Sequence, residues 1–308
     1  MANHILKFEG VIPPLLTPLQ EDGKVDLNGL EAIIEFQVKS GATGVFILGS
    51  SGEAIYHTDE TRTEIIAHTA KIVKNRVNIL VGALDSTPLR VIEQIHKLSN
   101  PNIDGWVVTA PYYANLSDEE VANHFRLISQ STSAPIMAYN IPGNTHRILS
   151  SSLLADLLNE GTITGLKDSS NNLPEFNEVV KKTKIRDVVS LLTGADSLAQ
   201  GALNLGADGF VPGLSNIRPD LFVSILNAHK SGDDKKVEQI QERINRLTKI
   251  YGIGQQFGIG RHASELGAMK IALVRSGILE TARLANPLSE YPKEAINTLY
   301  EVLDSVDQ

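Results

Sequence analysis

The sequence predicts an α/β protein that folds as a (β/α)8 TIM barrel with a C-terminal helical extension. Three observations support this prediction. The length of 308 residues exceeds a usual core of about 100–200 residues, whereas one barrel domain routinely reaches about 250 residues. Short apolar runs, each closed by Gly, Asn or Pro, recur at the spacing of one βα module. Segments with helical periodicity lie between these runs.

The apolar runs are the candidate strands of this barrel. Most of their residues are hydrophobic without alternation, as expected for parallel strands that are buried on both faces. The right-handed crossover rule leaves few arrangements for such strands, and an open doubly wound sheet is the alternative to the barrel. The eight runs are 11–16, 45–48, 79–81, 106–108, 136–138, 163–166, 189–192 and 210–211.

Local signals mark the helices between these runs. Thr58 and Ser117 each precede acidic residues, which is typical of helix N-caps, and Gly41 and Gly161 follow the ends of predicted helices. One face of the first helix is apolar and carries Leu30, Ile33, Ile34 and Val38.

Helical patterns continue beyond the eighth run. They cover 235–251, 264–276 and 291–305, without a Pro-rich or Ser-rich linker before them. The chain is therefore predicted to consist of a barrel with the active site, residues 1–232, and a helical extension packed on it, residues 233–308. The first pattern places these residues on one face: Val237, Ile240, Ile244, Leu247 and Tyr251.

Composition and charge disfavour several classes of function. With 28 Lys and Arg against 36 Asp and Glu, the net charge of -8 gives no general attraction to nucleic acid or anionic membranes. The absence of cysteine excludes disulfides, thiolate nucleophiles and thiolate zinc sites. The 8 histidines form no metal-binding motif, and no dinucleotide fingerprint occurs, so neither a metal nor a cofactor is expected. No signal peptide or membrane span is apparent, which predicts a cytoplasmic protein.

Lys167 is the strongest indication of chemistry in the sequence. It ends the sixth apolar run, and the active site of a (β/α)8 barrel lies at the carboxyl ends of its strands. A lysine at that position either forms an ion pair, for example with Asp168, or loses its proton by desolvation and becomes an amine that attacks carbonyl carbon. Position alone leaves both interpretations open, and Asp168 is also placed to cap the next helix.

Tyr139 ends the preceding run, so its side chain is expected to face the same cavity as Lys167. Its phenol could transfer protons, or it could be an ordinary core tyrosine with a satisfied hydroxyl. Tyr112 and Tyr113, after the fourth run, carry the same ambiguity.

The second run leads into a loop of small polar residues. Ser50 and Ser51, with the surrounding backbone amides, suit a carboxylate or phosphate, although such residues also form ordinary turns, and Glu53 could be an early acid of the next helix. The glycine-containing segments 194–196 and 206–209 are either phosphate sites or tight turns.

Together these strand ends resemble the dihydrodipicolinate synthase and N-acetylneuraminate lyase family. The likeness runs from about Gly10 to Asn216, with suitable helices afterwards. It implies a (β/α)8 barrel that acts without a cofactor and assembles as a homotetramer, with a dimer as the alternative. The matching motifs are Pro14 to Pro18 followed by Asp22 to Asp26, the loop Gly49-Ser50-Ser51-Gly52-Glu53, Tyr139-Asn140-Ile141-Pro142 and Gly165-Leu166-Lys167-Asp168.

The resemblance also implies roles for individual residues. Lys167 would form a Schiff base with the keto carbon of pyruvate or another 2-keto acid, and Tyr139 would shuttle the proton of the substrate hydroxyl. Tyr113 would reach into the neighbouring subunit's site and complete a proton relay with Ser50. Ser50 and Ser51 would also hold the substrate carboxylate. The other substrate-binding residues would be Gly49, Asn144 and Val211.

Asn144 indicates which branch of the family the chain resembles. Synthases typically have an arginine there to hold a dicarboxylic compound, and Arg147 would need a loop rearrangement to replace it. The asparagine suits a neutral polyhydroxylated tail, which favours an aldolase or lyase of a 2-keto-3-deoxy sugar acid, with sialic acid included. The alternatives are 4-hydroxy-tetrahydrodipicolinate synthase, which condenses pyruvate with aspartate semialdehyde in lysine biosynthesis, a dehydratase of keto-deoxy sugar acids, and a non-catalytic keto-acid-binding barrel.

Overall fold

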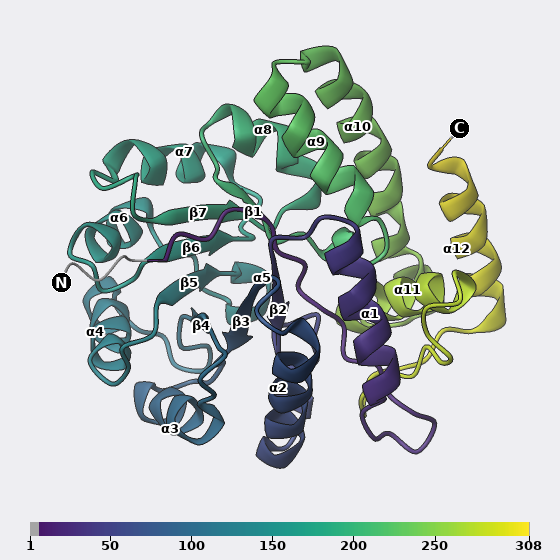
Figure 1. The fold of residues 1–308 in the computed structure, drawn as a ribbon, viewed down its shortest axis with the longest axis horizontal. Coiled ribbons are helices and arrows are strands. Elements are labelled where there is room, and N and C mark those ends of the chain that lie inside the picture. Colours follow the sequence, from purple (N-terminus) through teal and green to yellow (C-terminus); the bar gives the residue numbers. More distant parts are fainter. Residues whose placement is uncertain (1–5, 308) are drawn as a thin grey trace.

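The computed structural model describes residues 6–307, and the predicted barrel is confirmed. Parallel strands form one 8-stranded sheet in the order β1-β8-β7-β6-β5-β4-β3-β2, with helices around it (Figure 1). The strands are β1 (Gly10–Val11), β2 (Gly44–Ile47), β3 (Asn78–Gly82), β4 (Gly105–Thr109), β5 (Ile136–Asn140), β6 (Gly165–Asp168), β7 (Ser190–Thr193) and β8 (Gly209–Phe210).

Hydrogen bonds from β1 and the segment after it to β2 and the residue before β2 close the sheet into a barrel. The Thr43 amide donates to the Val11 carbonyl at 2.9 Å, and the Leu15 amide donates to the Phe46 carbonyl at 2.8 Å. The open doubly wound alternative is therefore wrong. β1 is much shorter than the predicted run 11–16, because Pro13 and Pro14 lack the N–H group that a regular ladder needs.

The helices between the strands begin and end at the signals found in the sequence. The Thr58 hydroxyl accepts a hydrogen bond from the Thr61 amide, and Ser117 forms a reciprocal capping box with Glu120. The helices from the first strand to the eighth and beyond are α1 (Leu27–Lys39), α2 (Asp59–Val73), α3 (Pro88–Leu98), α4 (Asp118–Ser129), α5 (Pro142–Thr145), α6 (Ser151–Asn159), α7 (Leu173–Lys182), α8 (Ala199–Asn204) and α9 (Pro219–Ser231).

Three further helices follow α9: α10 (Asp234–Leu247), α11 (Arg261–Arg275) and α12 (Lys293–Ser305). They gather on one side of the barrel, and α10 packs against α9 (Figure 1). The division of the chain at residue 232 stays a prediction. α10 ends four residues before Tyr251, which lies instead in the 3₁₀ segment η4 (Thr248–Gly252). Gly252 and Gly254, which favour helix poorly, follow there.

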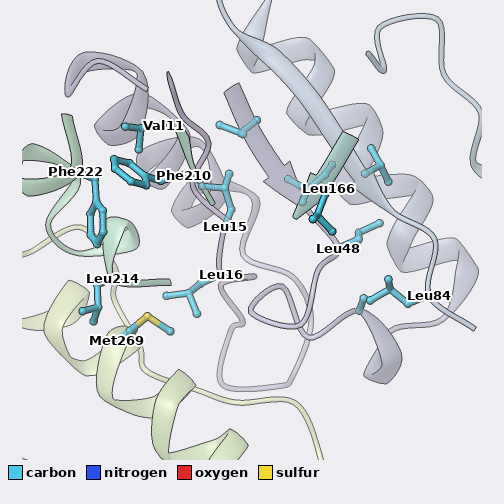
Figure 2. Close-up of a cluster of buried hydrophobic side chains, with 14 of the residues drawn as sticks. Val11, Leu15, Leu16, Leu48, Leu84, Leu166, Phe210, Leu214, Phe222 and Met269 are labelled. Carbon is cyan, nitrogen blue, oxygen red and sulfur yellow. The ribbon is translucent and has the colours of Figure 1, made fainter. Parts of the chain in front are cut away.

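Two apolar layers position the site. Inside the barrel, side chains from the strands form one cluster that includes Phe46 and Tyr139. Between the strands and the helices lies a larger cluster, in which Met269 of α11 joins Leu16 and Leu214 (Figure 2). The extension therefore shares the core of the barrel, and α11 is held next to the carboxyl ends of the strands. None of the helices in this described part of the chain is long and apolar enough to cross a membrane.

Candidate active site

A cavity of about 470 Å³ lies at the carboxyl ends of the strands. Its wall contains six of the eight predicted site residues and also side chains from α11. The predicted residues in this wall are Ser50, Ser51, Tyr139, Asn144, Lys167 and Val211.

Lys167 lies in β6 with only 3% of its surface exposed. Its Nζ is 4.0 Å from the centroid of the Tyr139 ring and 4.8 Å from that of Phe46. β5 and β6 are in a register that pairs Tyr139 with Lys167, which explains why the two side chains meet. The amine of Lys167 thus lies close to two aromatic rings, and the residue lines a cavity that has room for a small molecule.

Asp168 does not neutralise Lys167, so the predicted alternative of an ion pair is wrong. Its carboxylate instead accepts hydrogen bonds from Asn140 Nδ2 at 2.7 Å and Ser170 Oγ at 3.0 Å. Burial raises the pKa of Asp168, and these bonds oppose that effect. The cap of α7 is Asn172, so the suggested capping role of Asp168 is wrong as well.

A close approach of glycine makes room for the lysine. A Cβ atom at Gly194 would lie 3.0 Å from Lys167 Cε and 2.3 Å from Ser169 Oγ. The segment 194–196 therefore has a packing role beside β6. Asp196 of the same segment lines the cavity, and its acidic side chain disfavours a phosphate site at 194–196.

The loop after β2 is held in an unusual backbone conformation. Leu48 and Glu53 both have φ of 54°, in the left-handed region. The Leu48 carbonyl approaches Gly82 so closely that a Cβ there would lie 1.9 Å from its oxygen. Ser50 and Ser51 line the main cavity, whereas Gly49 lines a smaller neighbouring one together with Tyr112.

Glu53 is not an early helix acid, which corrects the sequence interpretation. Its side chain and that of Lys270 in α11 are both fully buried and form an ion pair. Glu53 Oε2 also accepts a hydrogen bond from the Ala285 amide at 2.6 Å, and Lys270 Nζ donates to the Arg283 carbonyl at 2.7 Å. Burial lowers the pKa of Lys270, and the Glu53 carboxylate opposes this effect. The pair holds α11 next to the loop 49–53, which carries Ser50 and Ser51 and is called the serine loop below.

Replacing Lys270 with methionine is expected to destabilise the fold, because it leaves the Glu53 carboxylate buried without its partner. Breaking a buried pair in this way costs about 3–5 kcal/mol. Urea unfolding followed by circular dichroism measures the change. The double variant Glu53→Gln, Lys270→Met should recover much of the loss, and Lys24→Met, at an exposed ion pair with Asp22, should change little. An unchanged midpoint for Lys270→Met would contradict the structural role of the pair.

Asn144 meets an arginine that the sequence analysis missed. Its Oδ1 accepts a hydrogen bond from Arg261 Nη2 of α11 at 2.9 Å, and its Nδ2 is 3.5 Å from Ser50 Oγ. Arg147 does not reach inward, because it pairs with Asp118 and donates to the Leu116 carbonyl. The arginine at this rim therefore comes from the C-terminal helices.

Two acids that the sequence analysis did not assign also line the cavity. Asp196 accepts hydrogen bonds from the Leu214 amide at 3.0 Å and the Tyr251 hydroxyl at 2.9 Å. Burial raises the pKa of Asp196 to about 6, although these two donors and the charge of Lys167 oppose the shift. Burial also raises the pKa of Glu265 in α11. Asp196 can therefore exchange a proton closer to neutral pH than an ordinary aspartate.

Tyr113 lies apart from the other predicted residues. It is 95% exposed, and it does not line the main cavity. In this single chain it is not assembled with Ser50, so its predicted place in a neighbouring subunit stays a prediction. Within residues 6–307, no group of three or more His, Asp or Glu side chains is arranged to hold a metal ion.

Comparison with known proteins identifies the family of this barrel. The profile of the Dihydrodipicolinate synthetase family matches residues 7–305. The chain belongs to this family. It is therefore an enzyme, and other members that resemble it are named lyase, aldolase or synthase. The resemblance seen in the sequence motifs is confirmed over nearly the whole chain.

Individual members of the dihydrodipicolinate synthetase family are similar at a moderate level. A DapA-like lyase of Pyrococcus furiosus is 28% identical over 297 residues, 96% of this chain and 97% of the relative. The putative 2-dehydro-3-deoxy-D-gluconate aldolase YagE of Escherichia coli is 28% identical over 301 residues, 96% of this chain and 97% of the relative. A 4-hydroxy-tetrahydrodipicolinate synthase of Gluconacetobacter diazotrophicus is 29% identical over 240 residues, 78% and 80% of the two chains.

Solved structures of the family superpose closely on this chain. The structure of YagE in complex with pyruvate gives a TM-score of 0.90 at 27% identity and covers 97% of this chain and 99% of that one. Dihydrodipicolinate synthase from Aquifex aeolicus gives 0.88 at 28% identity, with 97% and 98% covered. Family members with different names thus share the fold, so the fold does not distinguish their substrates.

Proposed function

We propose that this enzyme is a Schiff-base aldolase that cleaves or forms a C–C bond between pyruvate and an aldehyde. The observation that carries the proposal is the environment of Lys167, a buried amine between two aromatic rings in the wall of a cavity. Among the residues that the structure describes, no carboxylate forms an ion pair with Lys167, and a buried amine that is not held in an ion pair is suited to attack a carbonyl carbon. The binding of pyruvate by the related YagE supports pyruvate as the keto acid.

Cleavage begins with the attack of Lys167 Nζ on the keto carbon C2, and water is lost as the imine forms. The protonated imine then accepts the electron pair of the C3–C4 bond while a base removes the C4 hydroxyl proton. The aldehyde leaves and an enamine remains. Protonation of C3 and hydrolysis of the imine release pyruvate and restore the amine. Tyr139, whose ring lies against Nζ, is the group proposed to carry the hydroxyl proton.

The serine loop is proposed to hold the carboxylate of the keto acid. Ser50 and Ser51 line the same cavity as Lys167, and their hydroxyls are suitable donors. Val211, the residue after β8, supplies an apolar contact in that wall. Binding the carboxylate would fix C2 beside the amine, which is the positioning that covalent catalysis requires.

A 2-keto-3-deoxy sugar acid is the proposed substrate, with an aldehyde as the second product. Asn144 at the rim supports this choice, because its amide can both donate to and accept from hydroxyl groups. The name of the YagE relative points the same way. The second candidate is 4-hydroxy-tetrahydrodipicolinate synthase, and the observation that favours it is the guanidinium of Arg261 beside Asn144.

A homotetramer in the cytoplasm is proposed as the working form of the enzyme. Tyr113 is 95% exposed in the single chain, which suits a side chain that contacts another subunit. The absence of cysteine from the sequence suits a reducing compartment. Sedimentation of the wild type and of Tyr113→Ala would test the contribution of this side chain to assembly.

Borohydride reduction in the presence of pyruvate tests the proposed chemistry directly. The expected product is a stable pyruvate adduct, and peptide mass spectrometry should place it on Lys167. Borohydride without pyruvate is the control. Folded protein that gives no adduct, or an adduct on a different lysine, would contradict the Schiff-base proposal and favour a barrel that only binds keto acids.

A further inference from the structure

Helix α11 places two oppositely charged side chains at the rim of the cavity. Arg261 and Glu265 are one helical turn apart, and Arg261 Nε lies 3.7 Å from Glu265 Oε1. Both residues line the same cavity as Lys167. Their side chains are 52% and 32% exposed, so a molecule in the cavity can reach them.

A row of polar groups connects this pair with the serine loop. Arg261 Nη2 donates to Asn144 Oδ1 at 2.9 Å, and Asn144 Nδ2 lies 3.5 Å from Ser50 Oγ. Gly143 leaves room for the guanidinium, since a Cβ there would lie 2.9 Å from Arg261 Nη2. The row therefore runs from the predicted carboxylate-binding loop to α11, along the rim where the far end of a longer substrate would lie.

The donors and acceptors of this row match hydroxyl groups better than an anion. A guanidinium only donates, a carboxylate only accepts, and an amide does both, whereas each hydroxyl of a diol can donate and accept. The positive charge of Arg261 and the negative charge of Glu265 offset each other. A carboxylate at the far end of the substrate would also lie near Glu265 and Asp196, whose charges interact.

We propose that Arg261, Glu265 and Asn144 bind adjacent hydroxyl groups in the aldehyde-derived half of the substrate and select an uncharged polyhydroxylated tail. This inference rests on the proposed aldolase function and adds the residues that bind the hydroxyl groups of the tail. These are specificity residues, because they lie at the rim, away from the reacting carbon.

Condensation of pyruvate with matched aldehydes tests the assignment in the full-length enzyme. Glyceraldehyde carries two hydroxyl groups, propionaldehyde has the same number of carbons and none, and succinic semialdehyde carries a distal carboxylate. The ratio of kcat/KM for glyceraldehyde to that for propionaldehyde should fall about 10–100-fold in Arg261→Met and in Glu265→Gln, as expected for the loss of a hydrogen bond to a charged group. Arg261→Lys, which keeps a charged donor, should restore part of the ratio.

Arg275→Met is the matched control, because this residue lies at the other end of α11 and pairs with Asp304. Its ratio should equal that of the wild type. The inference would be overturned if the ratio were unchanged in both Arg261→Met and Glu265→Gln, even if kcat/KM fell equally for both aldehydes. A wild type that prefers succinic semialdehyde would also overturn it. Borohydride trapping of pyruvate separates the two proposals. An adduct together with an unchanged ratio refutes only the tail-binding residues, whereas a wild type without an adduct refutes the aldolase function on which they rest.

Discussion

Lys167→Ala is expected to abolish turnover, with a loss of at least about 10⁴-fold in kcat, because no other lysine of residues 6–307 lines the cavity and could form the imine that accepts the electron pair of the broken bond. The same variant should give no pyruvate adduct with borohydride. Pyruvate release from a sugar acid, followed with a coupled dehydrogenase, measures the first effect, and mass spectrometry measures the second.

Two controls separate chemistry from folding in that experiment. Lys167→Met keeps a flexible apolar side chain against the Tyr139 and Phe46 rings, so it should fold as the wild type does and be equally inactive. Lys181→Ala removes an exposed lysine of α7 and should keep full activity. Near-normal turnover in Lys167→Met would refute the Schiff-base mechanism.

Tyr139→Phe is expected to lower kcat by about 10²–10⁴-fold, the usual contribution of a general acid–base group. The ring should stay in place, because it packs edge-on against Phe46 and lies 4.0 Å from the Lys167 amine, and neither contact needs the hydroxyl. Imine formation should therefore persist, and borohydride should still give the Lys167 adduct. The expected signature is an enzyme that binds pyruvate covalently and then fails at proton transfer.

Unchanged turnover in Tyr139→Phe would show that another group moves the proton. Asp196 is the next candidate, because it lines the same cavity and burial raises its pKa to about 6. Asp196→Asn would then be the variant that loses activity. Loss of the borohydride adduct in Tyr139→Phe would instead indicate that the phenol is needed before the imine forms.

Much of the barrel could be predicted from the sequence because its strands and helix ends are determined by short stretches of neighbouring residues. Buried parallel strands need continuous apolar residues, and the run before Lys167 supplies them, although β6 begins and ends two residues later than predicted. The position of Lys167 and Tyr139 in one cavity follows from the same argument, since both lie near the carboxyl ends of neighbouring strands. Local hydrogen bonding also explains the successful N-cap predictions at Thr58 and Ser117.

The missed residues depend on packing between distant parts of the chain. Glu53 and Lys270 are 217 positions apart, so no local pattern distinguishes their buried pair from two surface charges. Arg261 reaches Asn144 only because α11 packs beside the strand ends, 117 positions away in sequence. The helical pattern predicted over 264–276 begins after Arg261, and it did not indicate which polar residues of the helix face the cavity.

The position of α11 has a consequence for how the enzyme is made. All eight strands precede α11 in the chain, so they leave the ribosome before Arg261, Glu265 and Lys270 do. A nascent barrel at that stage has Lys167 and Tyr139 but lacks one wall of its cavity, and Glu53 has no cation beside it. The docking of α11 therefore does two things: it neutralises the charge of Glu53 and it completes the substrate-binding surface. The enzyme thus becomes active only when the last part of its fold has formed.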